Sequence, residues 1–394
     1  MPLRLCIYVL TVVLNSLLLS GCETWFKAEP PRLTLRAAQF NQLPGWEQDD
    51  LSTFAPAFAR SCERILRKPA DARLGALPEA GTYRDWQPAC VAFQALDLKS
   101  NPAIRDWATT YMAPWEVRSG NEPTGLFTGY YEASLKGSRT PHHPYLTPLH
   151  TRPDDLVTVQ LGEFRESLKG QRIAGRVKDG ALHPYETRAS IVTGHWPHQD
   201  QALVWVDDPV DAFFVQIQGS GVVELDDGQL MRIGYDGQNG HPYFAIGREL
   251  IRRGELTPET VSMQSIRDWL SQHPDQADSV MNTNPSYVFF REIQREGAMG
   301  GEGVVLTAGR SLAIDHTQLA YGLPIFTDIA PPLPSEARLQ RLMVAQDTGG
   351  AIQGAVRGDV FWGFGDHAEW LAGHMKSEGR YWLLLPRHLT AGKS

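Results

Sequence analysis

The sequence predicts a mainly β protein with some helices, organised as two domains. Strand-like runs punctuated by glycine begin after Asn121 and stay mixed with helical stretches to about residue 280. From Tyr287 to the end, short strands separated by Gly and Pro follow one another, a pattern that predicts a β-barrel. A chain of 394 residues with 42% hydrophobic residues is long enough for two domains with full cores.

Residues 1–21 are typical of a bacterial lipoprotein signal peptide. Arg4 precedes the apolar run 5–19, which is shorter than the roughly 20 apolar residues of a membrane-spanning helix. The run ends in "LSGC", which resembles a lipobox and predicts acylation of Cys22; an ordinary signal peptide with an incidental cysteine is the alternative. Because Glu23 follows instead of aspartate, the resemblance to enterobacterial sorting predicts an outer-membrane lipoprotein facing the periplasm of a Gram-negative bacterium.

The segment after the signal peptide predicts a tether followed by helices. Residues 22–45 are polar and contain prolines, as expected for a tether from membrane to domain. Apolar residues then recur at helical spacing over residues 49–68, and further helices are expected at 87–98 and 102–112.

Two cysteines remain in the body of the mature chain. Cys6 is lost with the signal peptide and Cys22 is occupied by lipid, which leaves Cys62 and Cys90. An oxidising periplasm permits a disulfide between this pair, and two separate buried thiols are the alternative.

Composition narrows the possible partners. The net charge is −8 and no basic run or basic helix occurs, so nucleic acid is not expected as a partner. The histidines and remaining cysteines show no metal-ligand spacing, and we expect neither a metal nor a cofactor. The abundant aromatic residues suit stacking on sugar rings, although most are expected in the core. No heptad pattern or long apolar edge suggests an oligomer, so a monomer is expected.

The middle of the chain contains a candidate glycan-binding strand. Helices are expected at 244–253 and 258–272, and strands in the runs "QALVWVDD" and "AFFVQIQGSGVVEL". If "VQIQGSG" is a strand, Gln216, Gln218 and Ser220 share one face, where they suit the hydroxyl and N-acetyl groups of a glycan. A half-exposed strand without a ligand is the alternative.

Asp359 is a candidate general acid. It begins the run "DVFW", so it is expected at the start of a strand beside aromatic residues. Burial beside such residues, together with a second carboxylate, raises the pKa of a carboxyl group and keeps it protonated near neutral pH. Asp347 starts a turn-like "DTGG". A pepsin-type aspartic protease is disfavoured, because there is one DTG triplet and Gly350 stands where that protease loop usually carries Ser or Thr.

The chain resembles the membrane-bound lytic murein transglycosylase A family. The matching stretches lie most densely between Phe127 and Pro386 and occur in order: "FTGYYEASLKGS", "PYETRASI", "FFVQIQGSG", "RIGYDGQNGHPYFAIGREL", "NPSYVFFRE", "GVVLTAGRSLAIDHTQLAYGLPIF" and "AQDTGGAIQGAVRGDVFWGFGDHAEWLAGHMK". The last two resemble the 3D segment named for three aspartates, here Asp315, Asp347 and Asp359.

This resemblance implies a specific architecture. Residues 46–134 and 286–394 are expected to form a double-psi β-barrel domain with N-terminal helices. Residues 135–285 are expected to form a smaller inserted β-rich domain. A groove between the two domains is expected to hold a glycan strand.

The resemblance also implies the reaction. We expect cleavage of the β-1,4 bond between N-acetylmuramic acid and N-acetylglucosamine, with 1,6-anhydromuramoyl products. Asp359 is expected as the sole acid/base, with Asp347 and Asp315 in support and no metal or cofactor. Candidate sugar contacts are Thr128, Tyr131, Gln216, Gln218 and Ser220. The alternatives are a hydrolytic glycosidase on a similar barrel and a noncatalytic peptidoglycan-binding lipoprotein; cell-wall synthesis proteins are candidate partners.

Overall fold

The computed structural model describes residues 33–332 and 337–390. The signal peptide, Cys22 and the first part of the expected tether lie outside the described residues. The described residues form one compact unit. Among the described residues, no helix combines the length and apolar character needed to cross a membrane.

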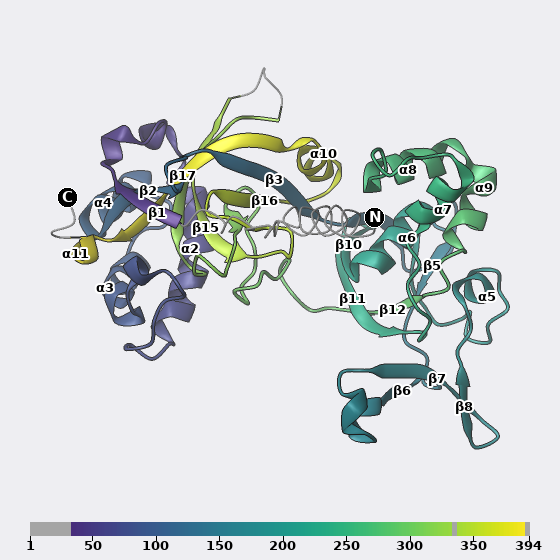
Figure 1. Ribbon diagram of the computed structural model, residues 1–394. Helices are drawn as coiled ribbons and strands as arrows, with labels where there is room; N and C mark the ends of the chain where they lie inside the picture. Colours follow the sequence, from purple (N-terminus) through teal and green to yellow (C-terminus); the bar gives the residue numbers. More distant parts are fainter. Residues whose placement is uncertain (1–32, 333–336, 391–394) are drawn as a thin grey trace, which may run out of the picture. The chain divides into compact units, whose positions relative to one another are not determined.

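The helices lie in three parts of the chain: before strand β2 (Met112–Ser119), in the middle of the chain and near the C-terminus (Figure 1). The described α-helices are α2 (Leu51–Leu66), α3 (Tyr83–Gln94), α4 (Asn101–Tyr111), α5 (Arg188–Val192), α6 (Pro209–Gln218), α7 (Ile246–Arg253), α8 (Met263–Gln272), α9 (Pro274–Met281), α10 (Asp366–His374) and α11 (Arg387–Thr390). Short 3-10 helices are η1 (Phe40–Gln42), η2 (Trp46–Gln48), η3 (Pro78–Ala80), η4 (Leu161–Glu163) and η5 (Glu166–Leu168).

The largest sheet contains a closed barrel. Its eight strands, in spatial order, are β1 (Leu33–Ala37), β2 (Met112–Ser119), β17 (Lys376–Pro386), β14 (Pro324–Ile329), β15 (Leu339–Asp347), β13 (Ser311–Ala313), β16 (Arg357–Phe364) and β3 (Gly125–Glu132). An additional pairing of β3 with β17 closes the six strands from β17 to β3 into a ring. The pairs β13–β15 and β16–β3 are parallel, and the other pairs are antiparallel. The predicted mainly β fold with a barrel is confirmed.

The middle of the chain forms two further sheets. The six-stranded sheet runs, in spatial order, β12 (Val288–Glu292), β11 (Leu230–Gln238), β10 (Ser220–Leu225), β4 (Ser134–Ser138), β9 (Ala202–Val206) and β5 (Thr147–His150). The three-stranded sheet contains β6 (Val157–Gln160), β7 (Arg172–Lys178) and β8 (Ala181–Pro184). Because β12 pairs with β11, the middle sheet extends beyond residue 285, where the sequence placed the end of the insert.

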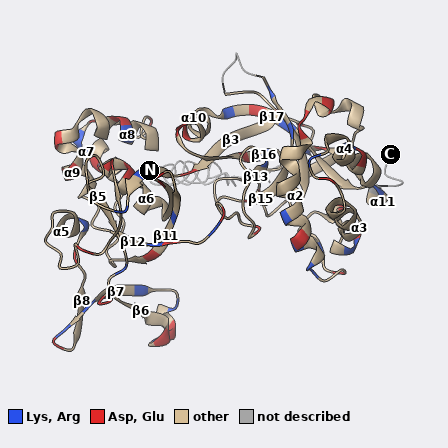
Figure 2. Ribbon diagram, turned by 180° about the vertical axis from the view of Figure 1, so that it is seen from behind, with Lys and Arg blue, Asp and Glu red and all other residues tan. Residues whose placement is uncertain are grey.

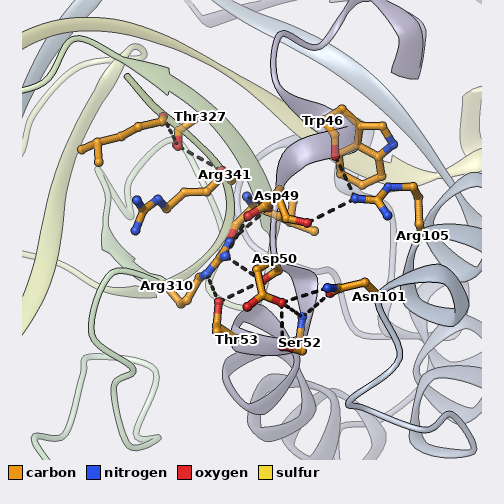
Figure 3. Close-up of polar contacts among 12 residues, drawn as sticks. Trp46, Asp49, Asp50, Ser52, Thr53, Asn101, Arg105, Arg310, Thr327 and Arg341 are labelled. Atoms are coloured by element: carbon orange, nitrogen blue, oxygen red, sulfur yellow. Dashed lines mark hydrogen bonds and ion pairs between the residues drawn. The ribbon is translucent and has the colours of Figure 1, made fainter. Parts of the chain in front are cut away.

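A buried ion pair fixes the start of α2 to the barrel (Figure 3). Charged residues of both signs are interspersed along the described elements (Figure 2). Among the ion pairs of these residues, Asp49–Arg310 is the most buried, with side-chain exposures of 2% for Asp49 and 6% for Arg310. The Asp49 carboxylate also accepts a hydrogen bond from Leu342 N of β15 at 2.7 Å. Asp50 caps the helix by accepting from Ser52 N.

The apolar face of α2 packs in the largest hydrophobic core, which it shares with the barrel strands. A disulfide joins Cys62 of α2 to Cys90 of α3, with 5.2 Å between the Cα atoms. Tying two helices of this core together reduces the conformational freedom of the unfolded chain.

Several predicted boundaries are wrong. The tether does not extend to residue 45, because Leu33–Ala37 form strand β1, which pairs with the edge of β2. The helix expected at 258–272 begins only at Met263, after the cap Ser262. Helix α10 was not expected, because the flanking glycines of "WGFGDHAEW" were interpreted as turns between strands.

Candidate active site

The strand register places two of the three aspartates on one row of the barrel. Ala313 of β13 pairs with Asp347 on one side and with Asp359 on the other. Asp359 in turn pairs with Thr128 of β3. Residues paired across neighbouring strands point to the same face, and strands lie about 4.8 Å apart, so the two aspartate Cα atoms are separated by about 10 Å. Asp347, Asp359 and Thr128 therefore share one face of the sheet.

Asp359 is half-buried and held by one hydrogen bond. Thr128 Oγ1 donates to Asp359 Oδ1 at 2.6 Å and itself accepts from Arg357 Nη2 at 2.9 Å. Among the described residues, no other group donates to the Asp359 carboxyl, so Oδ2 is left for a ligand. Burial raises the pKa of Asp359, the hydrogen bond from Thr128 and the Arg357 charge oppose this, and the Asp347 charge adds to the rise. The outcome is a carboxyl group that holds its proton more tightly than an exposed aspartate does.

Asp347 is held by three donors. Gly301 N and Thr348 N each donate to Oδ1 at 2.8 Å, and Tyr130 Oη donates to Oδ2 at 2.7 Å. Tyr130 is two residues beyond Thr128 on β3 and therefore points to the same face. Its pKa is raised by burial and by the charges of Asp347 and Asp359, so its hydroxyl stays a donor. These three donors fix the position of the Asp347 carboxyl group on the shared face of the sheet.

Asp315 holds a loop. Gly354 N donates to its Oδ2 at 2.9 Å, and the side chains of Thr317 and Gln318 also donate to its carboxylate. Burial of Asp315 opposes ionisation, but these hydrogen bonds together lower its pKa. Its side chain thus fixes the segment between Asp347 and Asp359 and does not contact either carboxylate.

A pocket of about 260 Å³ adjoins this row. Asp347, Tyr130 and Phe361 belong to its wall. Asp359 itself is not in the wall, but Phe361 is two residues beyond it on β16 and packs on Tyr130 with ring centroids 5.3 Å apart. The remaining lining residues are Tyr131, Glu132, Ser220, Arg232, Ile233, Ile293, Arg295, Gly297, Ala298, Met299 and Leu306.

The structure brings together only part of the expected glycan contacts. Thr128 donates a hydrogen bond to Asp359, and Tyr131 and Ser220 lie in the pocket wall. Tyr131 Oη also donates to Glu369 Oε1 of α10 at 2.8 Å. Gln216 is buried and accepts from Arg188, so it faces away from this pocket into a different one. Gln218 is exposed.

The expected strand "VQIQ" is wrong, because these residues end helix α6. Asp208 caps that helix by accepting from Val210 N and Asp211 N, and Pro209 occupies its first turn. Gly219 then ends it with a left-handed φ of 80°. Gln216, Gln218 and Ser220 therefore do not share a face. The Asp-Pro start and the glycine stop were visible in the sequence.

Sequence reasoning missed four side chains around the site. Arg357 and Tyr130 could have been found from strand alternation, because they stand two residues from Asp359 and Thr128 respectively. Arg232 and Glu132 form an ion pair between β11 and β3 in the pocket wall, and no local pattern predicts that pairing. Among the described residues, no group of three or more His, Cys, Asp or Glu side chains could hold a metal ion.

Two family models match the chain. Residues 126–291 match the MltA specific insert domain, and residues 310–385 match the 3D domain. The second match contains all three aspartates of the site.

Similar proteins and structures give the same result. The chain is 35% identical over 276 residues to a membrane-bound lytic murein transglycosylase A of Vibrio cholerae, covering 68% of this chain and 73% of the relative. The crystal structure of MltA from Neisseria gonorrhoeae matches with a TM-score of 0.70 and 30% identity, covering 90% of this chain and 91% of the other. The lytic transglycosylase LtgG of Burkholderia pseudomallei matches with a TM-score of 0.62 and 37% identity, covering 91% and 98%. The chain belongs to the membrane-bound lytic murein transglycosylase A family.

Proposed function

We propose that this protein is a peptidoglycan lytic transglycosylase that uses Asp359 as its only acid/base. It cleaves the β-1,4 bond between N-acetylmuramic acid and N-acetylglucosamine and leaves 1,6-anhydromuramoyl ends. The names of its relatives support this reaction class. The observation that carries the assignment of Asp359 is its half-buried carboxyl, which accepts one hydrogen bond and lies on the same barrel face as Asp347.

One carboxyl group suffices because the substrate supplies the nucleophile. Protonated Asp359 gives its proton to the departing O4 of the scissile bond. The carboxylate that results then takes the proton of the muramic acid C6 hydroxyl as this oxygen attacks C1 and closes the anhydro ring. Intramolecular attack replaces the water and the second carboxyl group that ordinary glycosidases need.

The neighbouring groups support this cycle. The relay from Arg357 through Thr128 orients the Asp359 carboxyl through Oδ1, which leaves Oδ2 to face the sugar. Asp347 lies on the same barrel face and is proposed to stabilise the positive charge that develops at C1 in the transition state. Asp315 contributes by fixing the loop 348–356.

The pocket wall supplies the proposed glycan contacts. Tyr131 and Ser220 remain candidates, together with Thr128 beside the acid. The barrel and the inserted sheets act as two domains in this proposal, with the boundary moved to include β12 in the insert. The Arg232–Glu132 ion pair in the pocket wall joins β11 of the insert to β3 of the barrel.

Asp359→Asn tests the assignment. We expect this variant to release no soluble muropeptides from purified sacculi while it still binds them and unfolds at the wild-type temperature. Turnover at the wild-type rate would refute the role of Asp359.

Mass spectrometry of the wild-type products separates the alternatives. Anhydro ends are lighter by one water than the reducing ends that a hydrolase leaves. A noncatalytic binding protein would bind sacculi and release nothing.

The chain is also proposed to be an outer-membrane lipoprotein anchored through Cys22. The lipobox-like "LSGC" and the membrane-bound relatives support this location. Cys22→Ala should move the protein from the membrane fraction to the soluble periplasmic fraction. Retention of the variant in the outer membrane would contradict a lipid anchor at this residue.

A further inference from the structure

A second pocket, in the middle of the chain, lies apart from the three aspartates. Its volume is about 290 Å³, and β5, α5, α6 and α9, which lie together in Figure 1, contribute to its wall. Its lining residues are Leu146, Thr147, Pro148, His150, Arg188, Val192, Thr193, Pro209, Ala212, Phe213, Gln216, Asp278, Met281, Asn282 and Tyr287.

The pocket contains a buried cation without a counter-ion. Arg188 is 4% exposed, and among the described residues no carboxylate forms an ion pair with it. Its Nε donates to Ser286 O at 3.1 Å and its Nη2 donates to Gln216 Oε1, both neutral acceptors. Burial lowers the pKa of Arg188 to about 10. Burying a charge that is not paired is costly, so such a group is retained where it meets an anion or serves another purpose.

The guanidinium is held in place before any ligand binds. Its Cζ lies 4.6 Å from the ring centroid of Phe213 and 5.4 Å from that of Tyr287. No described residue accepts a hydrogen bond from the remaining terminal nitrogen, Nη1. A fixed guanidinium with a free terminal nitrogen can donate a charge-assisted hydrogen bond to a carboxylate.

The rest of the wall suits an aliphatic group beside that anion. Leu146 and Val192 are 60% and 50% exposed, and Phe213 and Met281 are apolar wall residues. Asp278, the acidic residue of the wall, is exposed and makes no ion pair with Arg188. Burial lowers the pKa of His150 to about 4, so this ring is neutral and Arg188 is the cation of the pocket near neutral pH.

We propose that this pocket binds a carboxylate carried on a small aliphatic group, as at the C-terminus of a short peptide. A single cation with apolar neighbours fits a singly charged carboxylate better than a phosphate with its higher charge. If the proposed function holds, the short peptides attached to N-acetylmuramic acid are one source of such a group; free peptides are the other.

Titration calorimetry with defined probes tests the site. We expect N-acetyl-Ala-Ala with a free carboxylate to bind and its C-terminal amide not to bind detectably. Preference for the D,D over the L,L form points to murein peptides as the source, and equal binding points to free peptides. Equal binding of acid and amide, or binding of neither at millimolar concentration, would overturn the proposal.

Charge changes at the rim provide matched variants that leave Arg188 in place. Val192→Glu should weaken binding of the acid about three- to fivefold relative to Val192→Gln, because it adds a negative charge several ångströms from the ligand. Asp278→Asn should strengthen binding about twofold for the same reason. Unchanged affinity in both variants would place the probe elsewhere on the protein and overturn the proposal.

The two proposals fail separately. The acid should bind Asp359→Asn as tightly as it binds the wild type. Inactive wild-type protein that still binds the acid would refute only the lytic function, while active protein that does not bind it would refute only the second site.

Discussion

Glu302 is expected to make the free energy of unfolding depend on pH, and Glu302→Gln should remove most of this dependence. Glu302 is 7% exposed, and Ser61 Oγ of α2 donates to its Oε2 at 2.6 Å. Burial raises its pKa from 4.5 to about 7, although the Ser61 hydrogen bond and the Arg64 charge oppose the rise. The group therefore stays protonated in the folded protein over a range in which it ionises in the unfolded chain.

The sign and the magnitude follow from proton linkage. Between pH 4.5 and about 7 the folded protein binds more protons at this group than the unfolded chain does, so stability falls as pH rises. At 1.36 kcal/mol per pH unit, this span corresponds to about 3 kcal/mol of unfolding free energy. This contribution is fully present below pH 4.5 and is lost once the pH rises above about 7. Glutamine occupies a similar volume and can still accept the Ser61 hydrogen bond, but it has no charge to desolvate.

Guanidinium unfolding of wild type and variant at a series of pH values measures this effect. The stability of Glu302→Gln relative to the wild type should rise by about 3 kcal/mol from pH 4.5 to pH 8, mostly between pH 5 and 7. Glu296→Gln is the matched control, because Glu296 is exposed and loses little water on folding. A difference between Glu302→Gln and wild type that is constant across this range would refute the reasoning.

Two further predictions concern the candidate active site and the contacts that hold α2 to the barrel. Asp347→Asn should lower the pKa of Asp359, because the charge of Asp347 contributes to raising it. The alkaline limb of the pH–rate profile should therefore move to lower pH. An unmoved limb would show that the charge of Asp347 does not influence the titration of Asp359. Asp49→Ala should cost about 3–5 kcal/mol, because it leaves Arg310 buried without its partner. Asp50→Ala removes an exposed helix cap and a hydrogen bond from Asn101, without leaving a buried charge, and should cost about 1 kcal/mol. Equal losses in urea unfolding would contradict the importance of the buried pair.

The local sequence predicted those elements whose periodicity and caps agree. Helix α2 was expected at 49–68 and occupies Leu51–Leu66, because its apolar positions repeat at helical spacing and Asp50 caps it. Helix α6 was missed because "VQIQ" alternates apolar and polar residues, which favours a strand when it is considered alone. The cap at Asp208 and the stop at Gly219 outweigh that alternation.

The pocket with Arg188 illustrates a second limit. Arg188 is followed by "ASIV" in a short helix, and nothing in that stretch predicts a cation buried between Phe213 and Tyr287. The three residues are 25 or more positions apart in the sequence and meet only through packing of the insert. Long-range packing of this kind has no periodic signature in a single sequence.

Predicting the candidate active site requires both the local sequence pattern and the long-range pairing of strands. The motif singles out Asp359, and strand alternation alone places Arg357 on the same side of β16. The sequence cannot show that β3, more than two hundred residues earlier, pairs in parallel with β16 and brings Thr128 between them. That pairing converts two neighbouring side chains into an oriented relay, with Arg357 donating to Thr128 and Thr128 donating to Asp359. Because this relay occupies only Oδ1, the barrel topology rather than the motif determines which carboxyl oxygen is available for the proton transfer that we propose.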